Sequence, residues 1–295
     1  MTMVSTKYFV YCLKKNLIMN NSKIRLLKNY YQNKFKYIKE KIKLMFTSLI
    51  KYGLLFPFEL SVHLLISEII FSKPKKLSAE YQDFNFSKNM IIDAKTPNYY
   101  KKNYQFDYMD SFSLNIFIWE SLFKKFELKN SDINYLEIGC FEGRASVYIL
   151  EQIEKAYCYF VDPFKEYDEM TESTQQKNFT SIFENFSNNV QEFDGRYEIH
   201  QSTSDLFFNR LNISQKFDLV YVDGSHLSED VYRDAVNVDK HLNKGGFIIF
   251  DDFFWFWYDE RNDNPFFGIT KFLYENKKNY KIVYLGDQLI LRKQV

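Results

Sequence analysis

Short apolar runs alternate with amphipathic stretches along the chain from residue 130 onward. A short apolar run bounded by turn residues indicates a strand, and apolar residues repeating every three or four positions indicate a helix. The expected elements, in chain order, are a strand at 134–138, a helix at 144–155, a strand at 158–161, a helix at 171–190, a strand at 197–200, a helix at 205–211, a strand at 217–222, a helix at 227–242, a strand at 246–250, a helix at 269–277, and strands at 281–285 and 288–292. This alternation predicts a doubly wound α/β fold built on a mostly parallel, seven-stranded sheet.

Turn residues indicate where several of these elements begin and end. Ser228 is the expected N-cap of the helix at 227–242, and Gly245 with Gly246 is expected just past its end. Only Gly286 and Asp287 separate the last two strands, which is too short for a parallel crossover. We therefore expect an antiparallel hairpin at the end of the sheet.

The first hundred residues differ from the rest of the chain. Lysine and arginine recur at short intervals from Lys23 to Lys51, among apolar residues at roughly helical spacing, so this part is expected to be basic and helical. The apolar stretch 44–71 is long enough to cross a bilayer, but its charged residues each cost about 2.5 to 3.5 kcal/mol near the bilayer centre. A polar connector and a helix at 111–126 follow. We expect two parts: a basic, helical N-terminal region with its linker over 1–105, and the α/β domain over 106–295.

The net charge of +1 hides a division between these parts. Residues 1–80 hold 15 Lys and Arg against four Asp and Glu, whereas residues 81–295 hold 24 against 34. Three interpretations of the basic region stay open: a helical pair packed on the α/β domain, a segment that binds an anionic membrane surface, and an arm that binds nucleic acid.

The cysteines and the start of the chain bear on the compartment. The three cysteines lack CxxC or CxxH spacing, which argues against a disulfide framework or a zinc knuckle. The start of the chain has no uninterrupted apolar run of the kind found in export signals. We expect a cytoplasmic protein, peripheral to a membrane if the basic region binds one.

The segment YLEIGCFEGRAS, residues 135–146, joins the first strand to the next helix. Gly139 and Gly143 let the backbone approach a ligand closely, just before a helix N-terminus. The dinucleotide pattern GxGxxG is absent, and Glu137 and Glu142 would repel a pyrophosphate. An acidic turn suits a cationic ligand better, although an ordinary strand-to-helix turn has the same outline.

Asp162 ends the second strand, 23 residues after Gly139. An acidic residue about 20 residues beyond a glycine turn is placed to accept hydrogen bonds from the two hydroxyls of a ribose. The alternative is an aspartate that caps a helix before Pro163.

Carboxylates also follow two later strands. YVDGSHLSED places Asp223, and GGFIIFDD places Asp251 and Asp252, at the carboxyl ends of central strands, where open α/β sheets bind ligands. Such an all-oxygen set suits a hard cation such as Mg²⁺. His226 is the best candidate for a general base, because imidazole titrates near neutrality. The alternative is that these residues only cap and turn the chain.

Taken in order, the segments EIGCFEGRAS, VDPF, YVDGSH, LNKGGFIIFDDF, NPFFGITKFL and DQLILRK resemble those of class I S-adenosylmethionine-dependent methyltransferases. The chain is most similar to the small-molecule O-methyltransferase group that includes macrocin O-methyltransferase. The resemblance covers about residues 110–295 and implies a Rossmann-like methyltransferase domain. It implies that Glu137, Gly139 and Gly143 surround the methionine part of the cofactor, that Asp162 holds its ribose, and that the stretch 202–205, with Ser204, flanks its adenine. We also expect Cys140 and Asp223 to line the cofactor.

The same resemblance implies that Asp223, Asp251 and Asp252 can bind a divalent cation. With His226 as the candidate base, we expect Asp223 and His226 to be the catalytic residues. Three positions depart from the family pattern: Cys140 replaces a smaller residue of the turn, Thr203 stands where relatives often have Asp, and Ser225–His226 occupies the place of a catalytic Asp in sugar O-methyltransferases.

Methyl transfer from S-adenosylmethionine to an oxygen of a small or glycosylated acceptor, with Mg²⁺ as an optional aid, is the function that this resemblance implies. Two other functions stay open: a nucleic-acid methyltransferase that uses the basic N-terminal arm, and a scaffold that binds the cofactor without catalysis. The aromatic run at 253–267 is expected to form a lid over the acceptor, with a packed surface loop or an interface patch as alternatives.

Overall fold

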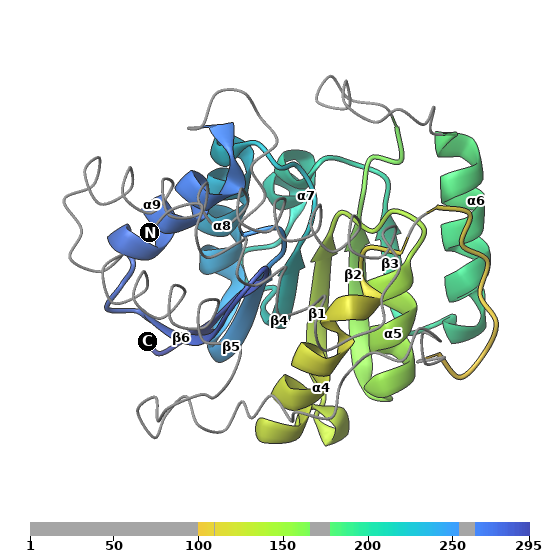
Figure 1. Cartoon of the computed structure of the whole chain (residues 1–295), viewed down its shortest axis with the longest axis horizontal. Helices are drawn as coiled ribbons and strands as arrows, with labels where there is room; N and C mark the ends of the chain where they lie inside the picture. The colour runs from red at the N-terminus through yellow and green to blue at the C-terminus, as the bar shows by residue number, and fades with distance from the viewer. Residues whose placement is uncertain (1–99, 109, 166–177, 254–262) are drawn as a thin grey trace, which may run out of the picture. The chain divides into compact units, whose positions relative to one another are not determined.

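The computed structural model describes residues 100–108, 110–165, 178–253 and 263–295. They form a seven-stranded sheet whose strand order is β3-β2-β1-β4-β5-β7-β6 (Figure 1). Its strands are β1 (Ile133–Ile138), β2 (Ala156–Val161), β3 (Tyr197–His200), β4 (Phe217–Val222), β5 (Leu242–Phe250), β6 (Tyr280–Leu285) and β7 (Leu289–Lys293). The first five strands are parallel, whereas β7 runs antiparallel to both β5 and β6. The predicted sheet and its terminal hairpin are confirmed.

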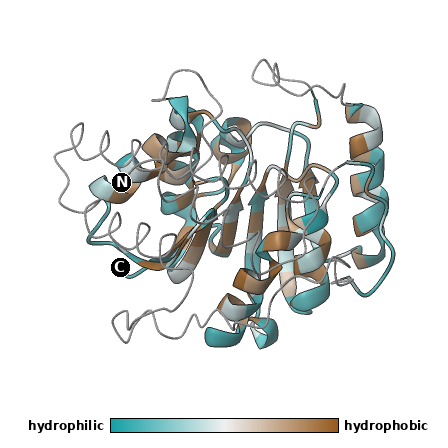
Figure 2. Cartoon of the chain, in the orientation of Figure 1, coloured by the Kyte–Doolittle hydropathy of each residue, from teal (hydrophilic) through white to brown (hydrophobic). Residues whose placement is uncertain are grey.

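Helices cover both faces of this sheet. They are α4 (Ile116–Lys125), α5 (Arg144–Gln152), α6 (Phe179–Val190), α7 (Ser204–Arg210), α8 (Ser228–His241) and α9 (Pro265–Glu275). Figure 1 shows α4, α5 and α6 on one face and α7, α8 and α9 on the other. Apolar colour concentrates in the sheet between these layers (Figure 2), as expected for parallel strands buried on both faces.

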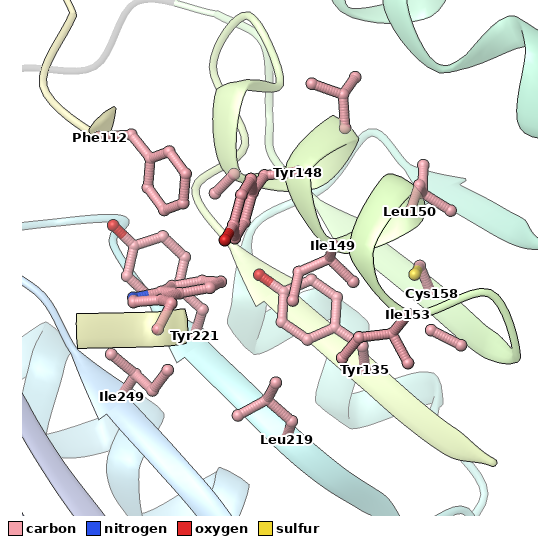
Figure 3. Close-up of a cluster of buried hydrophobic side chains, with 14 of the residues drawn as sticks. Phe112, Tyr135, Tyr148, Ile149, Leu150, Ile153, Cys158, Leu219, Tyr221 and Ile249 are labelled. Carbon is pink, nitrogen blue, oxygen red and sulfur yellow. The ribbon is translucent and has the colours of Figure 1, made fainter. Parts of the chain in front are cut away.

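Aromatic side chains fill much of the core between the sheet and α4 and α5. Trp119 is fully buried and meets the ring of Tyr221 edge-on, with ring centroids 4.9 Å apart. Phe112 contacts Trp119 in the same geometry at 5.0 Å, and Tyr148 lies against both rings (Figure 3). Edge-to-face pairs of this kind add to the stability that burial alone gives. The high aromatic content of the chain therefore serves its core here.

The boundaries of α8 differ from the prediction. Leu227, not Ser228, occupies the N-cap position, and no side chain caps the helix there. The nearby side-chain hydrogen bonds come from Ser225, whose hydroxyl accepts from the Leu227 amide and donates to the Asp230 carboxylate. At the other end the chain passes directly into β5 at Leu242, so Gly245 lies inside the strand rather than ending the helix.

Two other helices begin at different places from those expected. Asp110 accepts from the amides of Phe112 and Ser113, and a short 3-10 helix then delays the start of α4 to Ile116. Pro265 begins α9 four residues early, because proline suits the first helical position. The last part of the expected lid is therefore helix.

Several predictions fall on residues outside the described ranges. These are the basic helical region over 1–99, the start of the helix expected at 171–190, and residues 254–262 of the expected lid. The division between residues 105 and 106 stays a prediction. Among the described residues, no helix is long and apolar enough to cross a membrane.

Gly268 allows α8 and α9 to pack closely, which gives a test of this packing. A Cβ at position 268 would lie 2.0 Å from the carbonyl oxygen of Ser228. Alanine normally stabilises a helix interior by about 1 kcal/mol over glycine, but overpacking costs about 1 to 3 kcal/mol. We therefore expect Gly268→Ala to lower the melting temperature in calorimetry. Tyr274→Ala on the exposed side of α9 is the control and should change stability little, and a higher melting temperature for Gly268→Ala would contradict the packing described.

Candidate active site

The turn after β1 brings three strand ends together. Gly139 has a φ of 88°, and a Cβ there would lie 2.0 Å from the backbone oxygen of Asp223, so only glycine fits. The Gly139 amide donates to Val161 at the end of β2, and the Asp223 amide donates to Ile138. Three of the motifs singled out in the sequence therefore meet at the carboxyl edge of the sheet, as predicted.

Asp162 fastens this turn. One of its carboxylate oxygens accepts from the amides of Cys140 and Phe141, at 2.8 and 3.0 Å. The other accepts from the amide of Phe164 at 2.7 Å. Phe141 has a φ of 49°, which is strained for a residue with a side chain, so these bonds help to hold it. The predicted contact of Asp162 with a ribose stays a prediction beside this structural role.

Glu137 lies beneath the turn and is only 1% exposed. Burial raises the pKa of its carboxyl to about 8, although the hydroxyl of Tyr135 donates to it at 3.0 Å and opposes the shift. Near neutral pH this group therefore mostly holds a proton. A cationic ligand placed beside it would favour the ionised form.

Glu142 does not add its charge to the same place. It is 1% exposed and accepts from the amides of Asp107 and Tyr108, at 2.8 and 3.1 Å, and from the side-chain amide of Asn185 at 2.9 Å. The interpretation of the turn as acidic thus applies to Glu137 alone, because Glu142 is committed to the residues before α4.

Carboxylates converge beyond β4 and β5, as the sequence predicts, but in a different grouping. Asp223, His226 and Asp252 can each offer one ligand atom, with all three atoms within 4.8 Å of one another. His226 Nε2 lies 2.8 Å from Asp252 Oδ2. Asp251, the third expected metal ligand, is not in this group: it accepts from the Asp252 amide and from the Tyr221 hydroxyl.

Tyr221 joins Asp223 to Asp251. Its buried hydroxyl contacts Asp223 Oδ2 at 2.9 Å and also Asp251 Oδ2. The single hydroxyl proton of Tyr221 is therefore shared between two carboxyl groups. Burial and the charges of Asp251 and Asp252 raise the pKa of Asp223 well above its usual range, and burial with the charge of Asp252 raises the pKa of Asp251 to about 6. The sequence offered a signal for Tyr221, because residues two apart on a strand share a face.

The comparisons with known proteins concern the segment that carries these residues. Residues 136–253 match the family model of a methyltransferase domain. An uncharacterised protein of Acanthamoeba polyphaga mimivirus is 30% identical over 143 residues, which make up 48% of this chain and 61% of that protein. The chain thus spans less than two thirds of this relative's length.

Solved structures of other proteins are similar at low identity. TomG from Streptomyces achromogenes, an O-methyltransferase solved with SAM, is 14% identical with a TM-score of 0.43, covering 56% of this chain and 74% of its own. MycE, a methyltransferase of the mycinamycin pathway solved with Mg and SAH, is 15% identical with a TM-score of 0.44, covering 63% and 51%. Likenesses at this level carry no argument about the ligands or acceptor of this chain.

Ser204 lies at the same edge of the sheet, where α7 begins. Thr203 caps the helix, with its hydroxyl accepting from the Leu206 amide at 3.4 Å. The carboxyl of Asp234, on α8, interacts with the Ser204 side chain and is 4% exposed. Burial raises the pKa of this carboxyl to about 7. The sequence gave no reason to single out Asp234. The role of Ser204 beside an adenine stays a prediction.

The aromatic run after Asp252 has buried ends. Phe253 and Phe266 are 1% and 0% exposed, and their ring centroids lie 5.1 Å apart. The Phe253 amide donates to the carbonyl of Asp287 in the terminal hairpin at 2.8 Å. Both ends of the run are thus anchored in the core, and the lid stays a prediction.

The raised pKa values give a test by pH. A carboxyl whose pKa is higher in the folded than in the unfolded state stabilises the protein below its unfolded pKa of about 3.9 and loses that contribution as pH rises towards the folded value. With EDTA present to remove divalent cations, we expect the wild-type melting temperature to fall as the pH rises from 5 to 8. The fall should be about 2 to 4 °C for each kcal/mol by which the free energy of unfolding decreases. Asp223→Asn cannot ionise and should fall less. Asp263→Asn, at an exposed position, is the control, and equal slopes for Asp223→Asn and the wild type would contradict the assignment.

Proposed function

We propose that this chain transfers a methyl group from S-adenosylmethionine to an oxygen of a small or glycosylated acceptor, with a divalent cation assisting. The observation that carries the proposal is that the methyltransferase-domain match, residues 136–253, contains both the glycine turn and the acidic cluster, by which we mean Asp223, Asp251 and Asp252. The chemistry of the site fits a cationic cofactor, since the carboxyl beneath the turn, Glu137, is buried and ionises more readily beside a positive charge.

Each predicted cofactor residue has a role in this proposal. Glu137, Gly139, Cys140 and Gly143 would border the methionine part of the cofactor, Asp162 the ribose and Ser204 the adenine. The sulfonium cofactor supplies an electrophilic methyl group when bound. The chain contributes by aligning the acceptor oxygen with that methyl group and by excluding water, which are the main sources of rate for a displacement between bound partners.

The acidic cluster would activate the acceptor. The carboxylates of Asp223 and Asp252 are donors that suit a divalent cation of the Mg²⁺ or Mn²⁺ type, and the imidazole of His226 lies close beside them. In the proposal Asp223 and Asp252 hold the cation, and Asp251 supports them through its bonds to Tyr221 and to the Asp252 amide. His226 takes the proton from the acceptor hydroxyl, with Asp252 orienting its ring.

Cofactor binding is tested by calorimetry with S-adenosylmethionine. Hydrogen bonds to a charged group are worth about 1.5 to 3 kcal/mol, so Asp162→Asn should weaken binding by roughly 10- to 100-fold. The control is Asp263→Asn, which removes an exposed carboxylate about 100 residues beyond Asp162 in the sequence. This variant should bind S-adenosylmethionine as tightly as the wild type does. A wild type that binds neither S-adenosylmethionine nor its demethylated product would end the methyltransferase proposal.

The metal and the base are tested by turnover once an acceptor is found. We expect EDTA, Asp252→Asn and His226→Ala each to reduce turnover by roughly 100-fold or more, within the range by which general acid–base groups contribute. The dissociation constant for the cofactor should stay within about threefold, which is under 1 kcal/mol. Undiminished turnover in all three cases would remove the metal-and-base mechanism and leave the cofactor assignment standing.

A further inference from the structure

We propose that residues 100–108, which we call the strap, are a working part of the cofactor site, and that Glu142 is the positioning residue that fastens the strap to the glycine turn. This inference rests on the proposed function, because it concerns how the same site holds its cofactor. It assigns a role to a segment that precedes the region matched by the methyltransferase-domain model.

The strap is bound by side chains rather than by secondary structure. Residues 100–108, all described, form neither helix nor strand, so their backbone groups need other partners. The Lys101 amide donates to both carboxylate oxygens of Glu151 at 2.9 Å, and Asn189 pairs with both the amide and the carbonyl of Gln105 at 2.9 Å. Glu142 accepts from the amides of residues 107 and 108.

The polar side chains that hold the strap are buried. Glu142, Glu151, Asn185 and Asn189 are 1%, 7%, 4% and 4% exposed. Buried carboxylates and amides are tolerated only when they are hydrogen-bonded, and here those bonds go mainly to an irregular segment. The strap is therefore part of the domain's interior construction and not a loose connector.

Aromatic side chains complete the attachment. Tyr104, Phe106 and Tyr108 alternate with exposed residues, as in an extended segment with one face inward, and all three pack against the core cluster. The guanidinium of Arg144, the first residue of α5, lies 4.0 Å from the centre of the Phe106 ring and donates to the Tyr108 carbonyl at 2.8 Å.

The strap reaches the cofactor turn through Glu142 and Phe141. The Tyr108 ring meets the Phe141 ring edge-on, with centroids 5.2 Å apart. Phe141 holds the strained φ of 49° and donates its amide to Asp162, while its neighbour Glu142 binds the strap. Asn189 also donates to the Glu142 carbonyl, at 3.0 Å. The turn is thus held on one side by Asp162 and on the other by the strap.

This arrangement predicts an effect on binding as well as on stability. Strained backbone persists only where its surroundings over-determine it, and a site that must first be ordered binds its ligand more weakly. If the strap loosens next to Glu142, the Cys140 and Phe141 amides are freer to leave Asp162. If the strap loosens at Lys101, at its other end, the contacts of Glu142 with residues 107 and 108 remain and continue to hold the turn.

The experiment compares Glu142→Gln with Glu151→Gln in the full chain. Both replace a buried carboxylate that binds strap amides, but only Glu142 belongs to the turn. We expect Glu142→Gln to bind S-adenosylmethionine about tenfold more weakly, measured by calorimetry well below the melting temperatures of both variants. Hydrogen exchange should become faster at residues 107 and 108 in this variant. Glu151→Gln should speed exchange near residue 101 and keep the dissociation constant within twofold.

A second pair keeps the inference testable if Glu142→Gln does not fold. Tyr108→Leu removes the ring that covers Phe141 and should weaken cofactor binding severalfold. Tyr108→Phe keeps the ring and loses only the hydroxyl that accepts from the Asn178 amide at 2.8 Å, so it should bind the cofactor more tightly than Tyr108→Leu does. Equal binding by the wild type, Glu142→Gln and Tyr108→Leu would overturn the inference, as would equal weakening by Glu142→Gln and Glu151→Gln. A wild type that binds no cofactor would instead overturn the proposed function, and the inference with it.

Discussion

The close approach of the β1 and β4 backbones at their carboxyl ends governs the rest of the site. Gly139 passes so near the Asp223 carbonyl that no side chain fits between them, and backbone hydrogen bonds tie this point to the end of β2 as well. Because backbone contacts join the ends of β1, β2 and β4, the residues that follow these strands have fixed backbone positions. The turn, Asp162 and Asp223 therefore form one unit that the parallel sheet builds, and the loops have little freedom to rearrange it.

Carboxyl groups at this edge of the sheet fall into two classes. Asp162 and Glu142 accept backbone amides, so their oxygens are committed to holding chain segments in place. Glu137, Asp223 and Asp251 lack such donors in comparable number, and burial raises their pKa values. The first class organises the backbone, and the second has raised pKa values that a nearby positive charge would lower. The same residue type thus does structural and electrostatic work within one small region.

The sequence predicted what depends on local pattern and failed where the fold sets the direction of a side chain. Strand order along the chain and the convergence of motifs follow from apolar runs and from the shared edge of parallel strands. The direction of Asp251 depends on Tyr221 from the neighbouring strand, and that of Glu142 on residues 107 and 108, so neither could be deduced from spacing. The predicted cap at Ser228 is wrong because α8 already begins at Ser228, with Leu227 at the N-cap position.

The order β5-β7-β6 has a consequence for the route by which the chain folds. β6 is earlier in the chain than β7 but joins the sheet only through it, so β6 and β7 are best placed to form a hairpin first and to dock on β5 together. Docking carries Gln288 to the indole of Trp119, 169 residues earlier, and Asp287 to the amide after Asp252. The loop after Asp252 is thus held by a hairpin, and without that hairpin the edge of β5 would be open to pairing with other chains.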